Sequence, residues 1–126
     1  MKALSIRPPW AWLVCKGYKD IENRDWKIGK RLELPCRIYI HASKTIDGRA
    51  YLFVPENILP IPNIAYDNLG AIIGEVDITG CVEQSNSPWF IGKYGFILAN
   101  PVLYNKPIPY KGMLGFFEFK RIEESL

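Results

Sequence analysis

The nine residues Gly70–Ile78 read GAIIGEVDI, and this stretch decides the fold class of the chain. It begins with a glycine and is rich in β-branched side chains, which is typical of a buried β-strand. Two further runs of the same character follow it, namely Tyr94–Leu98 (YGFIL) and Leu114–Phe119 (LGFFEF). Before it, Ala3–Ile6 and Cys36–Ala42 also have strand character. Several short strands separated by turn signals indicate a small β-barrel.

The strand Cys36–Ala42 has the clearest alternation in the first half of the chain. Ile38, Ile40 and Ala42 fall on one face, and we expect this face to point into the core. Tyr39 and His41 then point to the opposite side. The strand is therefore predicted to be buried on one face and to carry polar groups on the other.

A short helix is predicted directly after the first strand. Pro9 suits the first position of a helix, where its missing N–H is not needed, and the helix should run to Lys16. Trp10, Leu13 and Val14 recur at spacings of three and four, so they should share its inner face. Gly17 then stands where a left-handed C-terminal cap is expected.

The remaining segments are predicted to be short helices or loops. A second short helix could lie within Ser43–Val54, with Asp47 as its N-cap. The proline-rich stretch Pro55–Pro62 should be a surface loop, and Asn105–Pro109 should be a loop or an edge segment because proline cannot donate to a ladder. The fold class is α+β and mainly β: one domain over residues 1–126, a small barrel with one or two short flanking helices.

Composition places the chain among ordinary globular proteins. Its 126 residues are 48% hydrophobic and 23% charged, with a formal net charge of +3 that permits a polyanionic partner. No apolar run approaches the roughly 20 residues of a membrane helix, and the N-terminus lacks a secretion signal, so we expect a cytoplasmic protein. The three cysteines, Cys15, Cys36 and Cys81, are widely spaced and should be small buried side chains rather than disulfides or zinc ligands.

Candidate site residues cluster after the predicted helix, where Gly17–Arg24 reads GYKDIENR. In an extended chain, Glu22, Arg24 and Trp26 lie on one side. Arg24 offers a planar fork to a phosphate or a base edge, Lys19 is a mobile charge, and Glu22 can accept from an exocyclic amine such as that of cytosine. The alternative is a set of exposed ion pairs, each worth ~0–1 kcal/mol.

A second signal comes from the aromatic residues, which make up 13% of the chain. Trp26 and Tyr94 are candidates for base stacking, whereas Trp10 is assigned to the core. A single histidine does not make a metal site, and we expect a structural or rim role for it. The full set of candidate ligand-binding residues is Arg24, Trp26, His41, Ser43, Lys44, Ser87 and Tyr94.

The order of these segments resembles an ASCH domain, a module that has a PUA-like barrel. The resemblance covers the chain from Leu4 to about Phe119. Its matching segments are Leu4–Ala11 (LSIRPPWA), Gly17–Arg24 with Trp26, Ile38–Ser43 (IYIHAS), Gly70–Val76 (GAIIGEV), Ser87–Phe90 (SPWF) and Tyr94–Phe96 (YGF).

The resemblance implies a cleft between the helix and the barrel, and binding of RNA or a nucleotide, often with a regulatory role in transcription or translation. Some similar bacterial proteins remove the acetyl group of N4-acetylcytidine with a lysine and a threonine three residues later. Lys19 matches that lysine, and Glu22 stands in place of the threonine. Ribonuclease activity is also associated with similar proteins. No cofactor or metal is implied.

Two main hypotheses follow from these residues. The first is a binding module that holds RNA or a modified nucleoside in the cleft. The second is a metal-free hydrolase for an acylated nucleoside, in which Lys19 activates the attack and Glu22 relays the proton. A third, weaker hypothesis is a protein-interaction adaptor that uses Pro55–Pro62.

Overall fold

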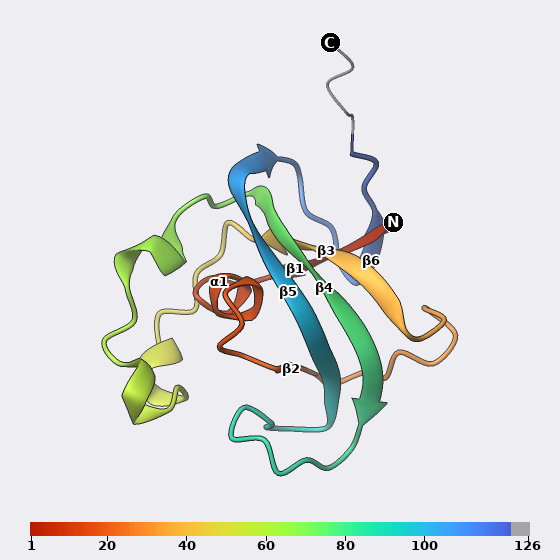
Figure 1. Cartoon of the computed structure of the whole chain (residues 1–126), viewed down its shortest axis with the longest axis horizontal. Coiled ribbons are helices and arrows are strands. Elements are labelled where there is room, and N and C mark those ends of the chain that lie inside the picture. Colours follow the sequence, from red (N-terminus) through yellow and green to blue (C-terminus); the bar gives the residue numbers. More distant parts are fainter. Residues whose placement is uncertain (122–126) are drawn as a thin grey trace.

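A computed structural model describes residues 1–121, and most of its ordered structure is one six-stranded sheet (Figure 1). Its strand order is β2-β5-β4-β3-β1-β6, with β1 and β3 parallel and the other neighbours antiparallel. The elements are β1 (Lys2–Ile6), α1 (Trp10–Cys15), β2 (Ile21–Arg24), β3 (Cys36–Ala42), three short 3₁₀ helices η1 (Ala50–Leu52), η2 (Glu56–Ile58) and η3 (Asn63–Tyr66), β4 (Ala71–Val82), β5 (Tyr94–Pro109) and β6 (Phe116–Glu118).

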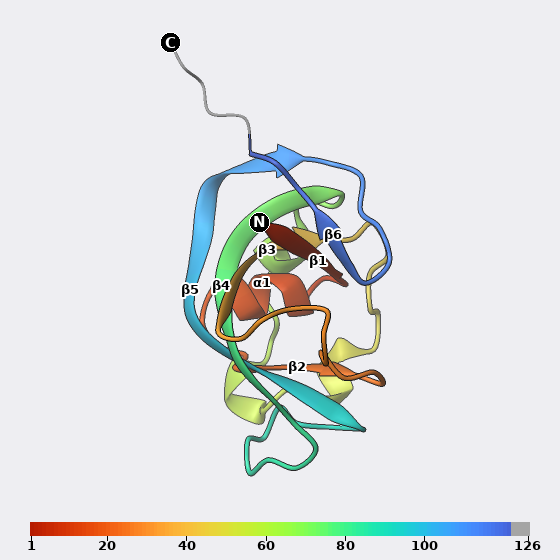
Figure 2. The ribbon, with the colours of Figure 1, turned by 90° about the vertical axis from the view of Figure 1, so that its right-hand side faces the viewer.

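The sheet curls into a half-barrel around α1, as the side view shows (Figure 2). The β4–β5 register shifts in three places, beginning between Ile72 and Gly74, and such irregularities bend a strand pair and increase its twist. The edge strands are β2 and β6. The predicted fold class, mainly β with a small barrel and few short helices, is confirmed, and the barrel takes the form of a curled half-barrel (Figure 2).

The main core lies between the sheet and α1. On β3, Ile38 and Ile40 are fully buried, as the alternation predicted. On α1, burial extends beyond the predicted stripe, since Ala11, Trp12 and Cys15 are buried along with Leu13 and Val14. A second apolar cluster covers the outer face of the sheet. Its members are Ala3, Tyr39, Ile72, Phe117 and Phe119.

Most predicted strands exist, but two of them are longer than expected. The strand β3 has the predicted bounds, whereas β4 continues to Val82 and β5 continues from Leu98 to Pro109. Of the two alternatives for Asn105–Pro109, the edge segment is the correct one, because these residues form the far end of β5. It pairs with β4 only, because β2 pairs with β5 no further than Ile97. Proline is tolerated there because one side of the strand is an open edge.

The segment between β3 and β4 differs from the prediction. Instead of a helix capped by Asp47, it has a single 3₁₀ turn, η1, whose N-cap is Arg49. Asp47 Oδ1 accepts a hydrogen bond from the Arg49 N–H, two residues further along, and this bond closes a short turn before η1. Three 3₁₀ turns follow one another here, and the Pro55–Pro62 stretch contains η2.

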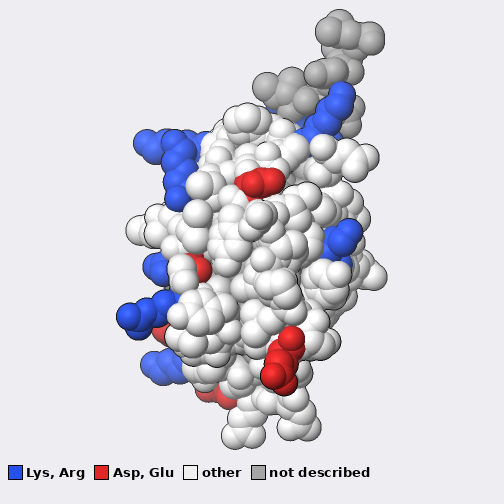
Figure 3. Space-filling model, turned by 90° about the vertical axis from the view of Figure 1, so that its left-hand side faces the viewer, with Lys and Arg blue, Asp and Glu red and all other residues white. Residues whose placement is uncertain are grey.

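The same segment carries many exposed apolar side chains. It lies to the left in Figure 1, and the middle of the face seen from that side carries few charged side chains, with Lys and Arg mostly near its margins (Figure 3). None of the helices in residues 1–121 has the length and apolar character needed to cross a membrane. The exposed apolar residues of the segment are Ile46, Tyr51, Leu52, Phe53, Leu59, Ile64 and Leu69.

Candidate functional site

The chain reversal after α1 places Lys19 beneath the helix. Gly17 has φ of +88°, a left-handed conformation that glycine adopts without strain, so the predicted cap is present. The N–H groups of Tyr18 and Lys19 both donate to the carbonyl of Leu13, at 3.0 and 3.1 Å. These bonds close the helix end and turn the chain back towards the start of α1.

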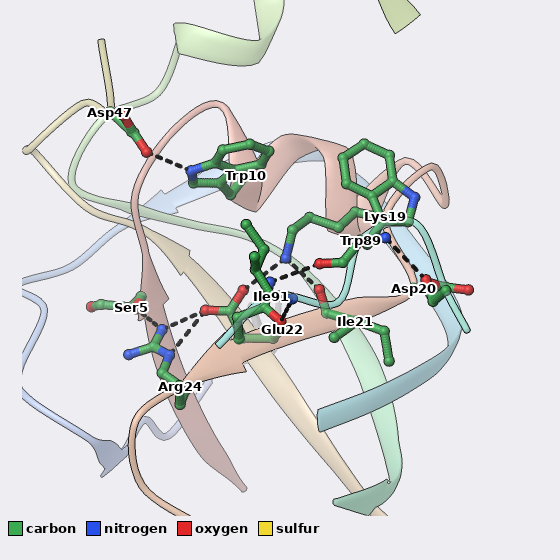
Figure 4. A network of polar contacts seen from close by, with 12 residues as sticks. Ser5, Trp10, Lys19, Asp20, Ile21, Glu22, Arg24, Asp47, Trp89 and Ile91 are labelled. Atoms are coloured by element: carbon green, nitrogen blue, oxygen red, sulfur yellow. Dashed lines mark hydrogen bonds and ion pairs between the residues drawn. The ribbon is translucent and has the colours of Figure 1, made fainter. Parts of the chain in front are cut away.

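The next residues form β2, which pairs antiparallel with the start of β5. Its alternation directs Glu22 and Arg24 to the same side. Lys19 Nζ lies 3.2 Å from Glu22 Oε1, and Glu22 Oε2 accepts from Arg24 Nε at 2.9 Å. Lys19 also donates to the carbonyl of Ile21. Figure 4 shows the three charged side chains in a row between Trp10 and Ser5.

Lys19 and Glu22 are buried, so the exposed ion pairs considered from the sequence do not describe them. Their exposed fractions are 5% and 7%. The Lys19 ammonium lies 5.6 Å from the ring centroid of Trp10, within the range of a cation–π contact. Arg24 Nη2 donates to the Ser5 carbonyl on β1 at 2.9 Å, so its side chain joins the edge strand β2 to the opposite part of the sheet. A buried row of alternating charges is costly unless every member is paired, as it is here.

Two tryptophans wall a hollow above this row. Trp10 and Trp89 meet edge to face, with ring centroids 6.4 Å apart. Trp10 Nε1 donates to Asp47 Oδ2 at 2.9 Å, which fixes the indole. Trp10 packs against the main core, as predicted, but it is only half-buried and also lines the hollow.

The loop that carries Trp89 is tied to β2 through Asn23. Its Nδ2 donates to the Trp89 carbonyl at 2.8 Å and its Oδ1 accepts the N–H of Ile91 at 3.0 Å. We call the resulting hollow, of about 230 Å³, the tryptophan pocket. It is lined by Trp10, Lys19, Glu22, Asn23, Asp47, Phe53, Trp89 and Ile91.

A second hollow, of about 560 Å³, adjoins the tryptophan pocket along β2 and is called here the arginine groove. Glu22, Arg24 and Trp26 all line it, as the predicted alternation requires. Trp26 is only half-buried, but its ring already contacts Arg31, whose guanidinium carbon lies 4.9 Å from the ring centroid. The ring is therefore less open to a stacking base than the sequence suggested.

His41, Ser43 and Lys44 line a third hollow, of about 710 Å³, beside the 109–114 segment. We call it the β5-end pocket. His41 is buried, and burial lowers its pKa below the ordinary value despite its contact with the Tyr110 carbonyl. Its Nε2 lies 2.7 Å from that carbonyl and its Nδ1 2.8 Å from Ser5 Oγ. Since a carbonyl only accepts, Nε2 carries the proton and Nδ1 accepts from Ser5.

The last two predicted site residues lie outside these three hollows. Ser87 Oγ donates to Asp20 Oδ1 at 2.7 Å and accepts the Trp89 N–H at 3.2 Å, so Ser87 holds the Trp89 loop. Tyr94 is half-buried at the start of β5, opposite Arg24 in the sheet register.

Sequence reasoning missed six residues that line the tryptophan pocket. Trp10, Asn23 and Trp89 lay within motifs that were already quoted, so a stricter use of those motifs could have found them. The other three come from loops far apart in the chain, and no local pattern marks them: Asp47, Phe53 and Ile91.

Comparison with known proteins supports the same fold. The structure is similar to the crystal structure of ASCH from Zymomonas mobilis, with a TM-score of 0.53 and 16% identity over 95% of this chain and 87% of that one. A mutant of that protein is similar at a TM-score of 0.52, also with 16% identity, over 95% and 88% of the two chains. Among curated protein sequences, none matches this chain. The family model for the ASCH domain matches residues 4–111. The chain therefore belongs to the ASCH domain family.

Proposed function

We propose that this ASCH domain binds RNA or a nucleotide, with an amino-bearing base such as cytosine in the tryptophan pocket. The observation that carries the proposal is the buried pair at its floor, where Lys19 and Glu22 stand side by side. Burying two charges beneath aromatic walls is costly, and their charge and polarity suit recognition of a polar ligand.

The unused hydrogen-bonding capacity of the pair fits such a base. Lys19 has three N–H donors and uses two of them, on Ile21 and Glu22. The Glu22 carboxylate can accept at about four positions. Lys19 contacts its Oε1, and Nε and Nη2 of Arg24 both contact its Oε2. One donor and about one acceptor position therefore remain, next to one another. Cytosine presents an amino donor beside ring acceptors, which is the complementary pattern.

The walls of the pocket fit the faces of a base. Trp10, Trp89, Phe53 and Ile91 surround the polar floor with aromatic and apolar surface. Stacking on an aromatic side chain contributes about 1–3 kcal/mol per base. The hollow of about 230 Å³ is smaller than the roughly 300–1,000 Å³ of sites that take drug-sized ligands, which favours a single ring system.

The test compares cytidine monophosphate with uridine monophosphate, which differ in the amino group that Glu22 would accept from. Wild-type protein should bind the cytidine nucleotide about tenfold more tightly, within the roughly 1–3 kcal/mol that a good base contact contributes. Glu22→Gln should remove most of this preference, while Glu118→Gln, a surface change on β6, should keep it. Isothermal titration calorimetry measures both affinities. Equal binding of the two nucleotides by wild type, or no binding of either, would contradict the proposal.

Hydrolysis of an acyl group on the same exocyclic amine is a second candidate, favoured by the 3.2 Å contact between Lys19 and Glu22 inside the pocket. Such a pair has the spacing expected of a catalytic dyad. The expected result is release of acetate from N4-acetylcytidine by wild type and its loss in Glu22→Gln, while product binding is retained in part. If wild type releases no acetate at high enzyme concentration, the hydrolase candidate fails for this substrate.

A further inference from the structure

The tryptophan pocket is the end of a longer depression. It shares Trp10, Glu22, Asn23 and Asp47 with the arginine groove. The arginine groove in turn shares a different set of four residues with the β5-end pocket. The three hollows are therefore arranged in series, with the arginine groove in the middle. The second shared set is Ser5, Ser43, Met113 and Leu114.

The chemistry changes along this series. The tryptophan pocket offers a flat apolar slot with a donor and an acceptor at its floor. The arginine groove adds Arg7 and Arg24, together with the acidic Asp25 and Asp47. The β5-end pocket combines an apolar lining, including the exposed ring of Tyr110, with Lys44 and Lys111.

Several cations along the series have free donors. Arg7, Lys44 and Lys111 are exposed, and within residues 1–121 none of them belongs to an ion pair. Arg24 uses Nε and Nη2 on Glu22 and Ser5, and its Nη1 has no hydrogen bond to the part of the chain that is described. An arginine that is already fixed by two bonds presents its third nitrogen in a set direction, which suits a phosphate oxygen. Asp25 and Asp47 oppose these cations, since the two bonds that Asp47 accepts, from Trp10 Nε1 and from the Arg49 N–H, come from neutral donors and leave its charge in place.

Backbone of the 109–114 segment comes very close to the floor of the β5-end pocket. A Cβ at Gly112 would lie 2.4 Å from Ser5 Oγ and 2.6 Å from a ring carbon of His41. Gly112 thus allows the 109–114 segment to pass over the Ser5–His41 pair, and the His41 bond to the Tyr110 carbonyl anchors that segment. The pocket has a fixed wall on this side rather than a loose loop.

From this arrangement we propose that the β5-end pocket is a second nucleotide subsite, and that the ligand is a single-stranded oligonucleotide rather than a free nucleotide. One base occupies the tryptophan pocket, the linking phosphates pass Arg7 and Arg24 Nη1, and a further nucleotide lies against Tyr110 with its phosphate near Lys44 and Lys111. The proposal rests on the proposed function, since it extends the ligand that the tryptophan pocket holds.

The test uses cytidine monophosphate and the 5′-labelled oligomers of three and six cytidines, as RNA and as DNA, in fluorescence anisotropy with unlabelled competitors. The variant Lys44→Ala/Lys111→Ala removes the charges of the β5-end pocket. The matched control, Lys106→Ala/Lys120→Ala, removes two exposed lysines that line none of the three hollows. Circular dichroism checks that both fold like the wild type.

Wild type should bind the trimer at least about fivefold more tightly than the monophosphate, the lower limit for one added stacking contact. Lys44→Ala/Lys111→Ala should lose that gain and keep its affinity for the monophosphate, while the control keeps both. The second subsite would be overturned if wild type bound the trimer no more tightly than the monophosphate, or if the two double variants lost equal affinity for the trimer. Either result would be compatible with binding of a nucleotide in the tryptophan pocket. Binding of neither probe would instead overturn the proposed function, and the second subsite with it. Tighter binding of RNA than of DNA would show that the 2′-hydroxyl is recognised, and equal binding would show that the site binds the bases and phosphates that the two strands share.

Discussion

Glu22 connects two cations in the interior of the site, and its removal should affect stability as well as binding. Glu22→Leu leaves the Lys19 ammonium buried without its carboxylate, and breaking a buried pair in this way costs about 3–5 kcal/mol. Because Lys19 keeps its bond to the Ile21 carbonyl, we expect the lower end, about 3 kcal/mol. Urea unfolding followed by circular dichroism measures the change. Glu118→Leu removes the partner of Lys2 on an exposed pair and should leave the unfolding midpoint in place; equal loss in both variants would contradict the special role of Glu22.

His41 should make the protein less stable in mild acid. Burial lowers the pKa of His41 in the folded state below the ordinary value near 6.5. The unfolded chain then binds the proton more readily, so stability is complete above pH 6.5 and is lost as the pH falls below it towards the folded pKa. The groups that face the ring are Ser5, the Tyr110 carbonyl and Phe117, none of which carries a charge.

Thermal unfolding between pH 7.5 and 5.5 tests this expectation, in a range above the ordinary pKa of carboxylates. The melting temperature of wild type should fall towards pH 5.5, and that of His41→Asn should start lower and change less. If the two proteins lose stability in parallel over this range, another group is responsible.

Lys19, Glu22 and Arg24 could be predicted from the sequence because their contacts are local. Lys19 and Glu22 are three residues apart, Arg24 is two residues further, and alternation in a strand is enough to align the last two. Their burial could not be predicted, since it depends on Trp10 and Trp89, which lie 79 residues apart and meet only in the folded chain. The remaining candidates are distributed over the arginine groove, the β5-end pocket and positions outside the three hollows, and this distribution also depends on tertiary structure. His41 and Lys44 lie at the far end of the series from Lys19 because β3 crosses the sheet away from β2.

At the level of elements, the contact between α1 and β4 depends on one glycine. A Cβ at Gly74 would lie 2.1 Å from the Val102 carbonyl oxygen and 2.7 Å from Cys15 Sγ. The first of these atoms is backbone and does not move without disturbing the β4–β5 pair. Gly74→Ala should therefore destabilise the protein by about 2 kcal/mol or more, through overpacking.

The matched control is Gly48→Ala, because the space around Gly48 is open and its φ is not in the left-handed region. Chemical denaturation should show a near-wild-type midpoint for this variant and a clearly lower one for Gly74→Ala. Comparable midpoints would mean that the sheet relaxes around the added methyl group.

The same elements show where pattern reasoning stops. The bounds of β3 were predicted correctly because its alternation is strict and its core face is apolar throughout. The length of β5 was not, since Pro101, Pro107 and Pro109 are strand-breaking signals and only the knowledge that this part of β5 is an edge removes the objection. The short helix predicted within Ser43–Val54 exists as the 3₁₀ helix η1, but Asp47 is not its N-cap, because an aspartate followed by glycine forms a short turn as readily as a cap.

For the whole molecule, the number of short strands predicted a small barrel, but the order of the strands did not follow from it. The order brings β2, the second strand in the chain, to the edge beyond β5, and leaves β1 beside β6. This arrangement creates the opening that the Arg24 side chain spans to reach Ser5, and so it creates the series of hollows. No local pattern contains that information, because it arises from pairing between segments more than 70 residues apart, such as β2 and β5.

The charge of the whole molecule sets the expected salt dependence of oligonucleotide binding. The net charge of +3 is modest, so long-range attraction of the strand should be weak. The exposed cations of the arginine groove and the β5-end pocket should then dominate the salt dependence. Arg7, Lys44 and Lys111 correspond to about three neutralised phosphates, and for single strands each contributes about −0.7 to the slope of log K against log salt concentration. The expected slope is therefore about −2 for a hexamer of cytidines titrated between 50 and 300 mM salt (roughly the range in which counterion release is measured). Arg7→Ala should bring it to about −1.4 and keep the affinity for cytidine monophosphate near that of wild type. A slope close to zero would mean that the strand does not contact these cations. A slope steeper than about −4 would mean that it also contacts cations outside the three hollows.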